Sequence, residues 1–251
     1  MNTDFTSESY LPQDILDIHT HTTASGHAYN TLYEMVQAAS DRKLPLFGSS
    51  DHGPAMPGSC SEMYFCNFKV IPRELFGIQL IMGCELNIMD YSGRVDLPER
   101  LLKRLDYGIA SIHDICYSIG TREENTAATV LAMKNPYVQI IGHPDNALIP
   151  LDYETVVREA KEQHVLLEVN NSSLKPDSPR PGARENYEIM LKLCRQYNVP
   201  VLVSSDAHCA YDVGNHRYAL AMLEELEFPQ ELIVNRSLKA LGEYLPCLSK
   251  A

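Results

Sequence analysis

Short apolar runs recur along the chain, and each run is followed by a cluster of polar residues. Seven such runs are rich in Val, Ile and Leu without a regular polar alternation. Runs of this kind are typical of strands that are buried on both faces of a parallel sheet. The predicted strands are residues 15–18, 45–50, 79–86, 107–112, 138–142, 165–169 and 199–205.

Segments between these runs have the spacing of amphipathic helices. The predicted helices are residues 32–43, 152–163, 183–197 and 216–227, and Asp152 is a suitable N-cap for the second. Alternating strands and helices predict parallel β/α units. At 251 residues, we expect a single α/β domain over residues 1–251, folded as a distorted (β/α)7, TIM-like barrel. An open doubly wound sheet is the alternative.

Composition narrows the protein class. No apolar run approaches the roughly 20 residues that span a bilayer, and residues 1–13 lack the basic and apolar regions of a secretory signal. Seven cysteines without a CxxC pair favour reduced thiols and a cytoplasmic location. The net charge of −12 disfavours a nucleic-acid partner. A small anionic substrate would need a local cationic centre from another source.

Metal-ligand side chains lie at the ends of six of the seven predicted strands, with Glu85 within the third, whereas the sixth strand ends in amides and hydroxyls. The carboxyl ends of the strands in a parallel barrel form one mouth, so we expect these side chains to converge there. They are His19 and His21, His27 in the loop that follows, His52, Glu85, His113, His143, Asp206 and His208.

The spacing of two pairs supports metal binding. Residues two apart on a strand point to the same side, which brings His19 next to His21 and Asp206 next to His208. Asp17 is in phase with the first pair and is predicted to orient a ligand histidine. A single HxH pair is weak support for a metal site, but ligand types at six separate strand ends are hard to explain by core histidines alone.

Four motifs give the chain a resemblance to the polymerase and histidinol phosphatase (PHP) family of metal-dependent phosphoesterases, in particular its small bacterial phosphatases of the YcdX type. The motifs are DIHTHT (17–22), SSDHG (49–53), IGHPD (141–145) and SSDAH (204–208), with further matches in GCELNI (83–88) and SIHD (111–114). The resemblance extends over about residues 15–245.

This resemblance implies a (β/α)7 barrel with three metal ions. His19, His21, Glu85 and Asp206 would hold the first ion, and Glu85 would bridge to a second ion. The second ion would also bind His113 and His143, and the third would bind His27, His52 and His208. Zinc is the first expectation because imidazole dominates the ligands, with Mn²⁺ or Fe²⁺ as alternatives.

The implied reaction is hydrolysis of phosphomonoesters, with no catalytic residue beyond the metal ligands. Water on such ions loses a proton near pH 7, which supplies hydroxide for in-line attack, and the ions neutralise the phosphoryl oxygens. The expected partner is a small phosphorylated molecule, with no membrane. A homo-oligomer is open, and a trimer is an expectation by analogy only.

Residues that would bind the substrate phosphate are less well defined. The polar segment 170–184 follows the sixth strand, and its candidates are Asn170, Ser172, Arg180 and Arg184. Arg217 and His216 are further candidates, whereas His164 is expected at the surface. An ordinary polar loop explains the same segment equally well.

Other functions remain open at this stage. A histidinol-phosphatase-like or exonuclease-like phosphoesterase would use the same centre, although the acidic charge disfavours the nuclease. A metal-storage or metal-sensing protein would bind ions without catalysis. A metal-dependent amidohydrolase shares the HxH pair, but such enzymes typically bridge their metals with a lysine, where this chain has Glu85.

Overall fold

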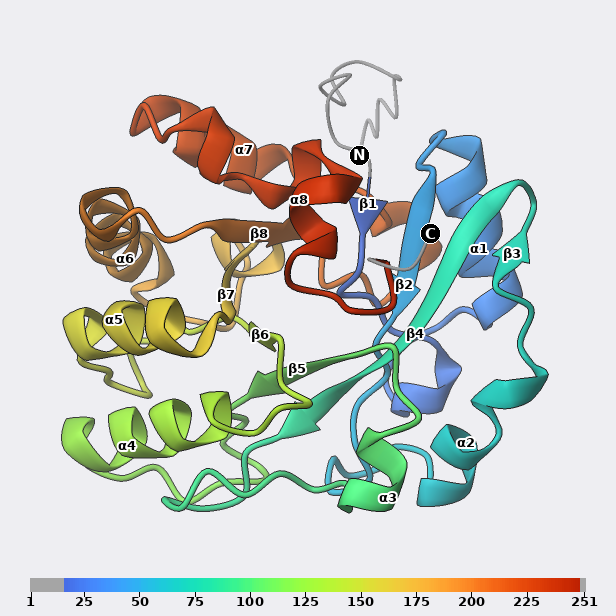
Figure 1. The fold of residues 1–251 in the computed structure, drawn as a ribbon, viewed down its shortest axis with the longest axis horizontal. Coiled ribbons are helices and arrows are strands. Elements are labelled where there is room, and N and C mark those ends of the chain that lie inside the picture. The colour runs from blue at the N-terminus through green and yellow to red at the C-terminus, as the bar shows by residue number, and fades with distance from the viewer. Residues whose placement is uncertain (1–15, 249–251) are drawn as a thin grey trace.

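A parallel sheet curls into a nearly closed barrel with helices around it (Figure 1). The structure is a computed structural model and describes residues 16–248. Its strands are β1 (Leu16–Asp17), β2 (Leu46–Ser49), β3 (Glu74–Leu75), β4 (Ile78–Asn87), β5 (Tyr107–Ser111), β6 (Ile140–Ile141), β7 (Leu166–Asn170) and β8 (Val201–Ser204). Seven of these strands follow the predicted runs, although Ile15 lies outside the described residues.

The seven predicted strands pair in the order β1-β2-β4-β5-β6-β7-β8, and all of these pairings are parallel. The short strand β3 forms an antiparallel hairpin with β4, which the sequence did not predict. At the gap between β8 and β1, Thr20 and Ala207 form an isolated parallel bridge. This contact brings the two ends of the sheet together, so the barrel prediction is confirmed and the open sheet is excluded.

Helices surround this sheet in Figure 1, most of them on the outside of the barrel and α8 across one end. They are α1 (Leu32–Asp41), α2 (Glu62–Cys66), α3 (Glu99–Leu102), α4 (Arg122–Met133), α5 (Tyr153–Gln163), α6 (Ala183–Tyr197), α7 (Arg217–Glu225) and α8 (Leu238–Gly242). The four predicted helices correspond to α1, α5, α6 and α7, and Asp152 occupies the N-cap position of α5. Within residues 16–248, none of the helices has both the length and the apolar character needed to cross a bilayer.

The barrel interior holds its own small hydrophobic core, closed at one end by α8. Tyr107 lies inside the barrel, and its hydroxyl donates a hydrogen bond to the carbonyl of Ile18. A Cβ at Gly83 would lie 2.5 Å from the Tyr107 ring, so only glycine leaves room for it. The interior core includes Leu16, Ile18, Leu46, Ile81, Ile109, Ile140, Leu166, Leu202, Leu241 and Leu245.

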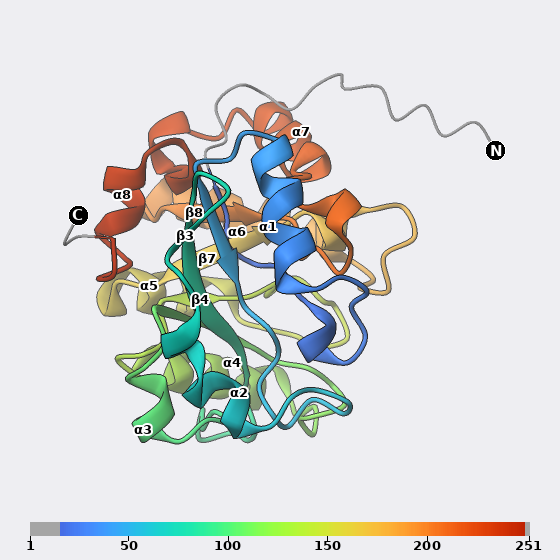
Figure 2. The same cartoon turned by 90° about the vertical axis from the view of Figure 1, so that its right-hand side faces the viewer.

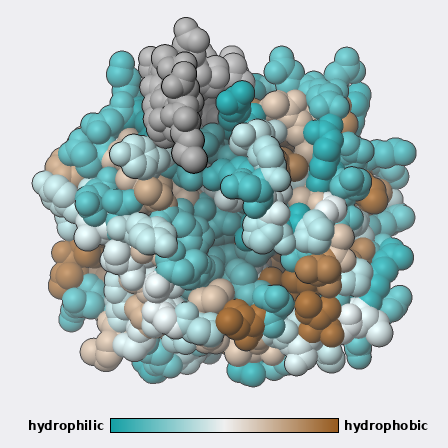
Figure 3. Space-filling view, turned by 180° about the vertical axis from the view of Figure 1, so that it is seen from behind, coloured by the Kyte–Doolittle hydropathy of each residue, from teal (hydrophilic) through white to brown (hydrophobic). Residues whose placement is uncertain are grey.

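The two ends of the barrel differ in character. Figure 2 shows α8 on one side of the molecule and the loop after β1 on the opposite side. The face opposite α8 is seen in Figure 3, where it is hollowed near the centre and hydrophilic in the hollow. Because the apolar core closes the α8 end, the polar chemistry is confined to the other end, at the carboxyl ends of the strands.

Candidate metal centre

Glu85 lies at the centre of a cluster of imidazoles at the carboxyl ends of the strands. It is fully buried near the end of β4. Its Oε1 lies 2.8 Å from Nε2 of His143 and 3.3 Å from Nε2 of His113. Its Oε2 lies 2.8 Å from Nδ1 of His52. One carboxylate therefore contacts histidines from three different strand ends.

A second set of ligand types surrounds the other side of Glu85. The Nε2 atoms of His19 and His21 each lie 3.4 Å from Glu85 Oε2. Asp206 Oδ1 lies 3.7 Å from Nε2 of His19 and 3.2 Å from Nε2 of His21. The two histidines of the HxH pair thus face two carboxylates from β4 and the loop after β8.

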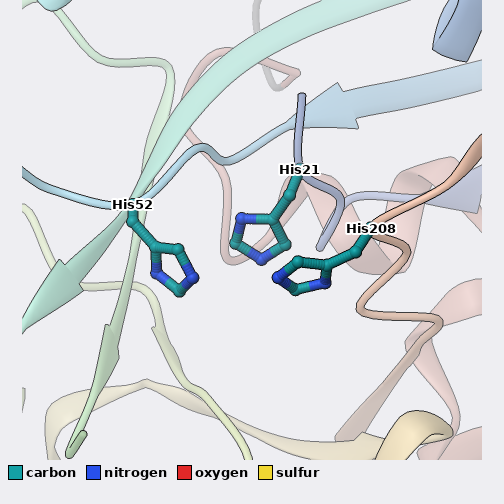
Figure 4. Close-up of side chains that lie close together, drawn as sticks. All are labelled: His21, His52 and His208. Carbon is teal, nitrogen blue, oxygen red and sulfur yellow. The ribbon is translucent and has the colours of Figure 1, made fainter. Parts of the chain in front are cut away.

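The third group is the most open to solvent. His21, His52 and His208 point into one space in Figure 4, and the ring of His21 stacks against those of His52 and His208 at 4.3 and 4.2 Å. Beside them, the Nε2 atoms of His27 and His208 lie 3.0 Å apart. His27 is exposed, whereas His21 and His52 are buried.

Several polar side-chain atoms in this cluster are buried without a hydrogen bond to any part of the chain that the structure describes. They are Nε2 of His19, Nε2 of His21, Nδ1 of His52 and Oε2 of Glu85. Buried polar atoms without partners are costly. Nitrogen and carboxylate atoms aimed at a common space fit a divalent cation. Three groups have a spacing that suits an ion: His19 with His21 and Glu85, His52 with Glu85 and His113, and His21 with His52 and His208.

His19 and His21 each have a hydrogen-bond partner at Nδ1, the ring nitrogen that points away from Glu85. His19 Nδ1 lies 2.6 Å from Oε1 of Glu168, a fully buried carboxylate of β7. His21 Nδ1 lies 3.0 Å from the hydroxyl of Ser25, which donates to Asp51 Oδ1. Such partners fix the tautomer and the orientation of a metal-binding imidazole.

His113 is held in a similar way from the strand next to its own. Its Nδ1 lies 2.8 Å from Oδ1 of Asn87, whose Nδ2 donates to Asp96. The Asp96 carboxylate also accepts hydrogen bonds from the backbone N–H groups of Ala55 and Asn87. This chain fixes the His113 ring relative to Glu85.

Asp17 does not have the predicted role. Its carboxylate accepts hydrogen bonds from the Ser205 hydroxyl and the Gly214 N–H, and it lies 3.7 Å from His216 Nε2. The prediction that Asp17 orients a ligand histidine is therefore wrong. Because β1 ends at Asp17, regular strand alternation does not continue to His19.

Glu168 is one of the residues beside the cluster that the sequence did not predict. It lies within the apolar run 165–169, two residues before Asn170 and therefore on the same side of β7. A carboxylate on the same side of the strand as Asn170, two residues before the predicted mouth, is the sequence signal that identifies Glu168.

Electrostatics in the cluster favour ionised carboxylates. Burial alone would raise the pKa of Glu85, but the surrounding histidines, led by His52 and His19, hold it well below its usual value. Burial and then the charge of Arg180 lower the pKa of His143 to about 4, so this imidazole is neutral at pH 7. Burial would also lower the pKa of His19, but Glu168 and Glu85 outweigh it and raise that pKa.

Two of the cluster residues have backbone conformations that side chains rarely adopt. His143 has a φ of 28° and Asp206 a φ of 54°. Strained backbone of this kind persists only where the surroundings hold it, and it is concentrated at functional sites. Each residue lies two positions beyond the end of a short strand at the mouth, β6 for His143 and β8 for Asp206.

The predicted substrate residues have different surroundings. Arg180 reaches the cluster, where its Nη2 donates to Asp206 Oδ2 at 3.1 Å and its Nη1 donates to Ser173. Asn170 is buried, and its Nδ2 donates to Glu168 and Asp206.

The remaining candidates lie apart from these contacts. Arg184 is half exposed and pairs with Glu225 and Glu188 on α7 and α6, and Arg217 is exposed beside the Tyr218 ring. His216 is buried next to Asp17. His164 is exposed and stacks on Tyr244, as expected for a surface residue.

Ser172 begins a short 3-10 turn, Ser172–Leu174, after β7. This turn leads into the loop that carries Arg180. The predicted polar loop is therefore partly a structural connection and partly a source of side chains for the mouth.

The fold and the cluster together define a parallel barrel with a candidate polynuclear metal centre at its mouth. Residues 17–172 match the PHP domain family, and residues 185–232 match the PHP-associated family. The chain belongs to the PHP domain family, which confirms the resemblance seen in the motifs.

Relatives of nearly the same length are named as phosphatases. A "probable phosphatase" of Caldicellulosiruptor saccharolyticus is 49% identical over 92% of this chain and 95% of the relative. A second "probable phosphatase", from Clostridium novyi, is 45% identical over 94% of this chain and 96% of the relative. The family and these relatives confirm the predicted class, a hydrolase of phosphate esters.

Solved structures share the fold at low sequence identity. The histidinol phosphate phosphatase of Lactococcus lactis, solved with zinc, L-histidinol and phosphate, has a TM-score of 0.58 and 17% identity over 86% of this chain and 95% of its own. A chain in an archaeal ribonuclease P structure has a TM-score of 0.55 and 18% identity over 94% of this chain and 90% of its own. Both show the fold alone.

Proposed function

We propose that this protein is a phosphatase that hydrolyses phosphomonoesters at a centre of three divalent ions. His19, His21, Glu85 and Asp206 would hold the first ion. Glu85 would bridge to the second ion, which His113 and His143 would also hold. His27, His52 and His208 would hold the third. The observation that carries the proposal is the set of buried ligand atoms around Glu85 that lack hydrogen bonds within the described residues.

The donor set favours zinc, with Mn²⁺ or Fe²⁺ as alternatives. Seven of the nine proposed ligands are histidines, and imidazole suits these borderline ions better than Ca²⁺ or Mg²⁺. Bound ions would supply an activated water nucleophile and positive charge for the phosphoryl oxygens. In a chain with a net charge of −12, that positive charge is what would attract an anionic substrate.

Arg180 is the side chain that we propose for phosphate binding. It is largely buried, and its guanidinium lies between Asp206 and the Ser173 hydroxyl, beside the metal centre. Arginine presents a planar fork of donors that matches phosphate oxygens. It also lines a pocket of about 350 Å³ together with Lys175, Arg184 and Tyr218, which offers space for the rest of a small substrate.

Asn170 has a supporting part in this proposal. Its amide donates to Glu168 and Asp206, so its donors are already used within the protein. It would hold the Asp206 carboxylate in place, while Arg180 faces the substrate. The cytoplasm is the proposed location, based on the free cysteines.

The decisive experiment pairs elemental analysis with hydrolysis of p-nitrophenyl phosphate before and after chelation. We expect close to three ions per chain, with activity lost on chelation and regained on return of the metal. His21→Ala should lose ions and activity, whereas His164→Ala, which removes an exposed histidine, should lose neither. Three ions without turnover of any phosphoester would contradict the phosphatase and favour a binding protein.

A substrate panel separates the related phosphoesterase functions. Histidinol phosphate and single-stranded DNA test the histidinol-phosphatase-like and exonuclease-like alternatives on the same preparation. We expect turnover of small phosphomonoesters and none of DNA, since the acidic chain would repel a polyanion.

A further inference from the structure

The Glu168 carboxylate contacts two of the proposed ligand residues at once. Its Oε1 accepts hydrogen bonds from His19 Nδ1 at 2.6 Å and from the Ser204 hydroxyl. Its Oε2 accepts from the backbone N–H of His143 at 2.6 Å and from the Asn170 amide at 3.1 Å. Glu168 is fully buried, so these four donors replace water around its charge.

We infer that Glu168 is a positioning residue that couples the first and second metal positions. The inference rests on the proposed function, in which His19 binds the first ion and His143 binds the second. Each oxygen of the carboxylate holds one of these two ligands, so neither position can form its correct geometry independently of the other.

The contact with His19 sets which ring nitrogen can bind metal. An ionised carboxylate only accepts hydrogen bonds, so His19 must carry its proton on Nδ1. Metal binding would displace the proton on Nε2, so the lone pair of the neutral ring then lies on Nε2, the atom that faces Glu85 and Asp206. Glu168 therefore selects the tautomer that the first metal position requires.

The contact with His143 sets a backbone conformation. The φ of 28° at His143 is disfavoured for any residue except glycine. The N–H of His143 donates to Glu168 Oε2, and this bond holds the residue in that conformation. In the same conformation, Nε2 of the ring reaches Glu85 Oε1 at 2.8 Å.

Replacement of Glu168 by glutamine gives a sharp test because a glutamine cannot serve both contacts. If the amide oxygen faces His19, the amide N–H₂ group faces the N–H of His143, and two donors meet. If the N–H₂ group faces His19, the ring must accept at Nδ1, which moves its proton to Nε2 and blocks metal binding there. Either orientation disrupts one of the two metal positions.

The experiment measures metal content and affinity of the purified Glu168→Gln protein against a series of chelator concentrations. Loss of an outer-shell partner typically weakens metal binding about 10- to 100-fold. We expect one or two ions to be lost under conditions in which the wild-type protein keeps three, with the His27, His52 and His208 ion retained. Co²⁺ substitution should show the change independently of activity, as an altered visible absorption band.

Asn235→Ala is the matched structural control. Asn235 is buried and makes two hydrogen bonds to the backbone of Val203 in β8, without contact to a proposed ligand. It should lower the stability of the fold while three ions remain bound. If Glu168→Gln does not fold, Glu168→Asp keeps the buried charge but is too short to span both contacts, and the same loss of metal is expected.

The possible outcomes separate this inference from the proposed function. Metal affinities in Glu168→Gln or Glu168→Asp within twofold of the wild-type values would overturn the coupling role alone. A wild-type protein that binds no divalent ion would overturn the proposed function, and the coupling role with it.

Discussion

The Nε2 atoms of His27 and His208 lie 3.0 Å apart, although 181 positions separate the two residues in the sequence. Their loops are also joined through the backbone, since the N–H of Tyr29 donates to the carbonyl of His208. His27 is exposed and the side chain of His208 is 30% exposed, whereas those of His19 and Glu85 are 0% and 1% exposed. The proposed third ion thus has the most accessible ligands of the centre.

This difference in burial predicts stepwise removal of the metal. A chelator should take the third ion first, because it can approach exposed ligands without opening the barrel. Elemental analysis along a chelator titration should therefore show a plateau near two ions per chain. Loss of all three ions in a single step would contradict the prediction. The His208→Ala protein should already contain about two ions per chain before any chelator is added.

Glu85→Ala should affect the whole centre, since this carboxylate contacts five of the histidines. We expect loss of at least two ions and a decrease in kcat/KM of about 10³-fold or more, because roughly 4 kcal/mol of transition-state stabilisation would be lost. Metal content and phosphomonoester hydrolysis are measured together. An active Glu85→Ala protein with three ions would show that Glu85 is not a ligand.

Gly83→Ala should destabilise the barrel without a direct effect on the ligands. The new Cβ would lie 2.5 Å from the Tyr107 ring, which cannot move far because its hydroxyl is bound to Ile18. Overpacking of this kind typically costs about 1–3 kcal/mol. Urea denaturation of the metal-free protein provides the free energy of unfolding. An unchanged midpoint would mean that the interior tolerates a methyl group at this position.

Much of the fold and of the histidine cluster could be predicted from the sequence, because apolar runs mark the strands and the cluster lies at the strand ends. Continuous apolar runs fixed the seven parallel strands, and the residues just after them necessarily meet at one mouth. His113 and His143 could therefore be assigned to the same site without any local motif that joins them. The hairpin of β3 with β4 was not predictable in this way, since Glu74 and Leu75 have no distinctive pattern.

The contacts behind the ligands were harder to predict. Asp17 and Glu168 are both buried carboxylates on barrel strands, yet only Glu168 contacts the ring of a proposed ligand. The sequence places both carboxylates near the mouth. Which of them contacts a proposed ligand depends on where β1 ends and on which neighbouring side chain fills the barrel interior. Those are properties of packing between strands that are distant in sequence, and periodicity within one strand does not contain them.

Arg180→Ala is the test of how the substrate phosphate is held. A charged hydrogen bond to phosphate contributes roughly 1.5–3 kcal/mol, so KM for phosphomonoesters should rise about 10- to 100-fold. Metal content should stay close to the wild-type value, because Arg180 is not itself a proposed ligand and the Asn170 amide still donates to Asp206 Oδ2 in the variant. Steady-state kinetics together with elemental analysis measure both quantities.

Arg184→Ala provides the comparison, since its guanidinium lies on the same pocket but is already paired with Glu225 and Glu188. We expect a change in KM of less than about threefold, because an exposed pair contributes under roughly 1 kcal/mol. A larger effect at Arg184 than at Arg180 would place the phosphate on the α6 side of the pocket. Equal KM values in the wild-type protein and both variants would mean that bound ions alone hold the phosphate.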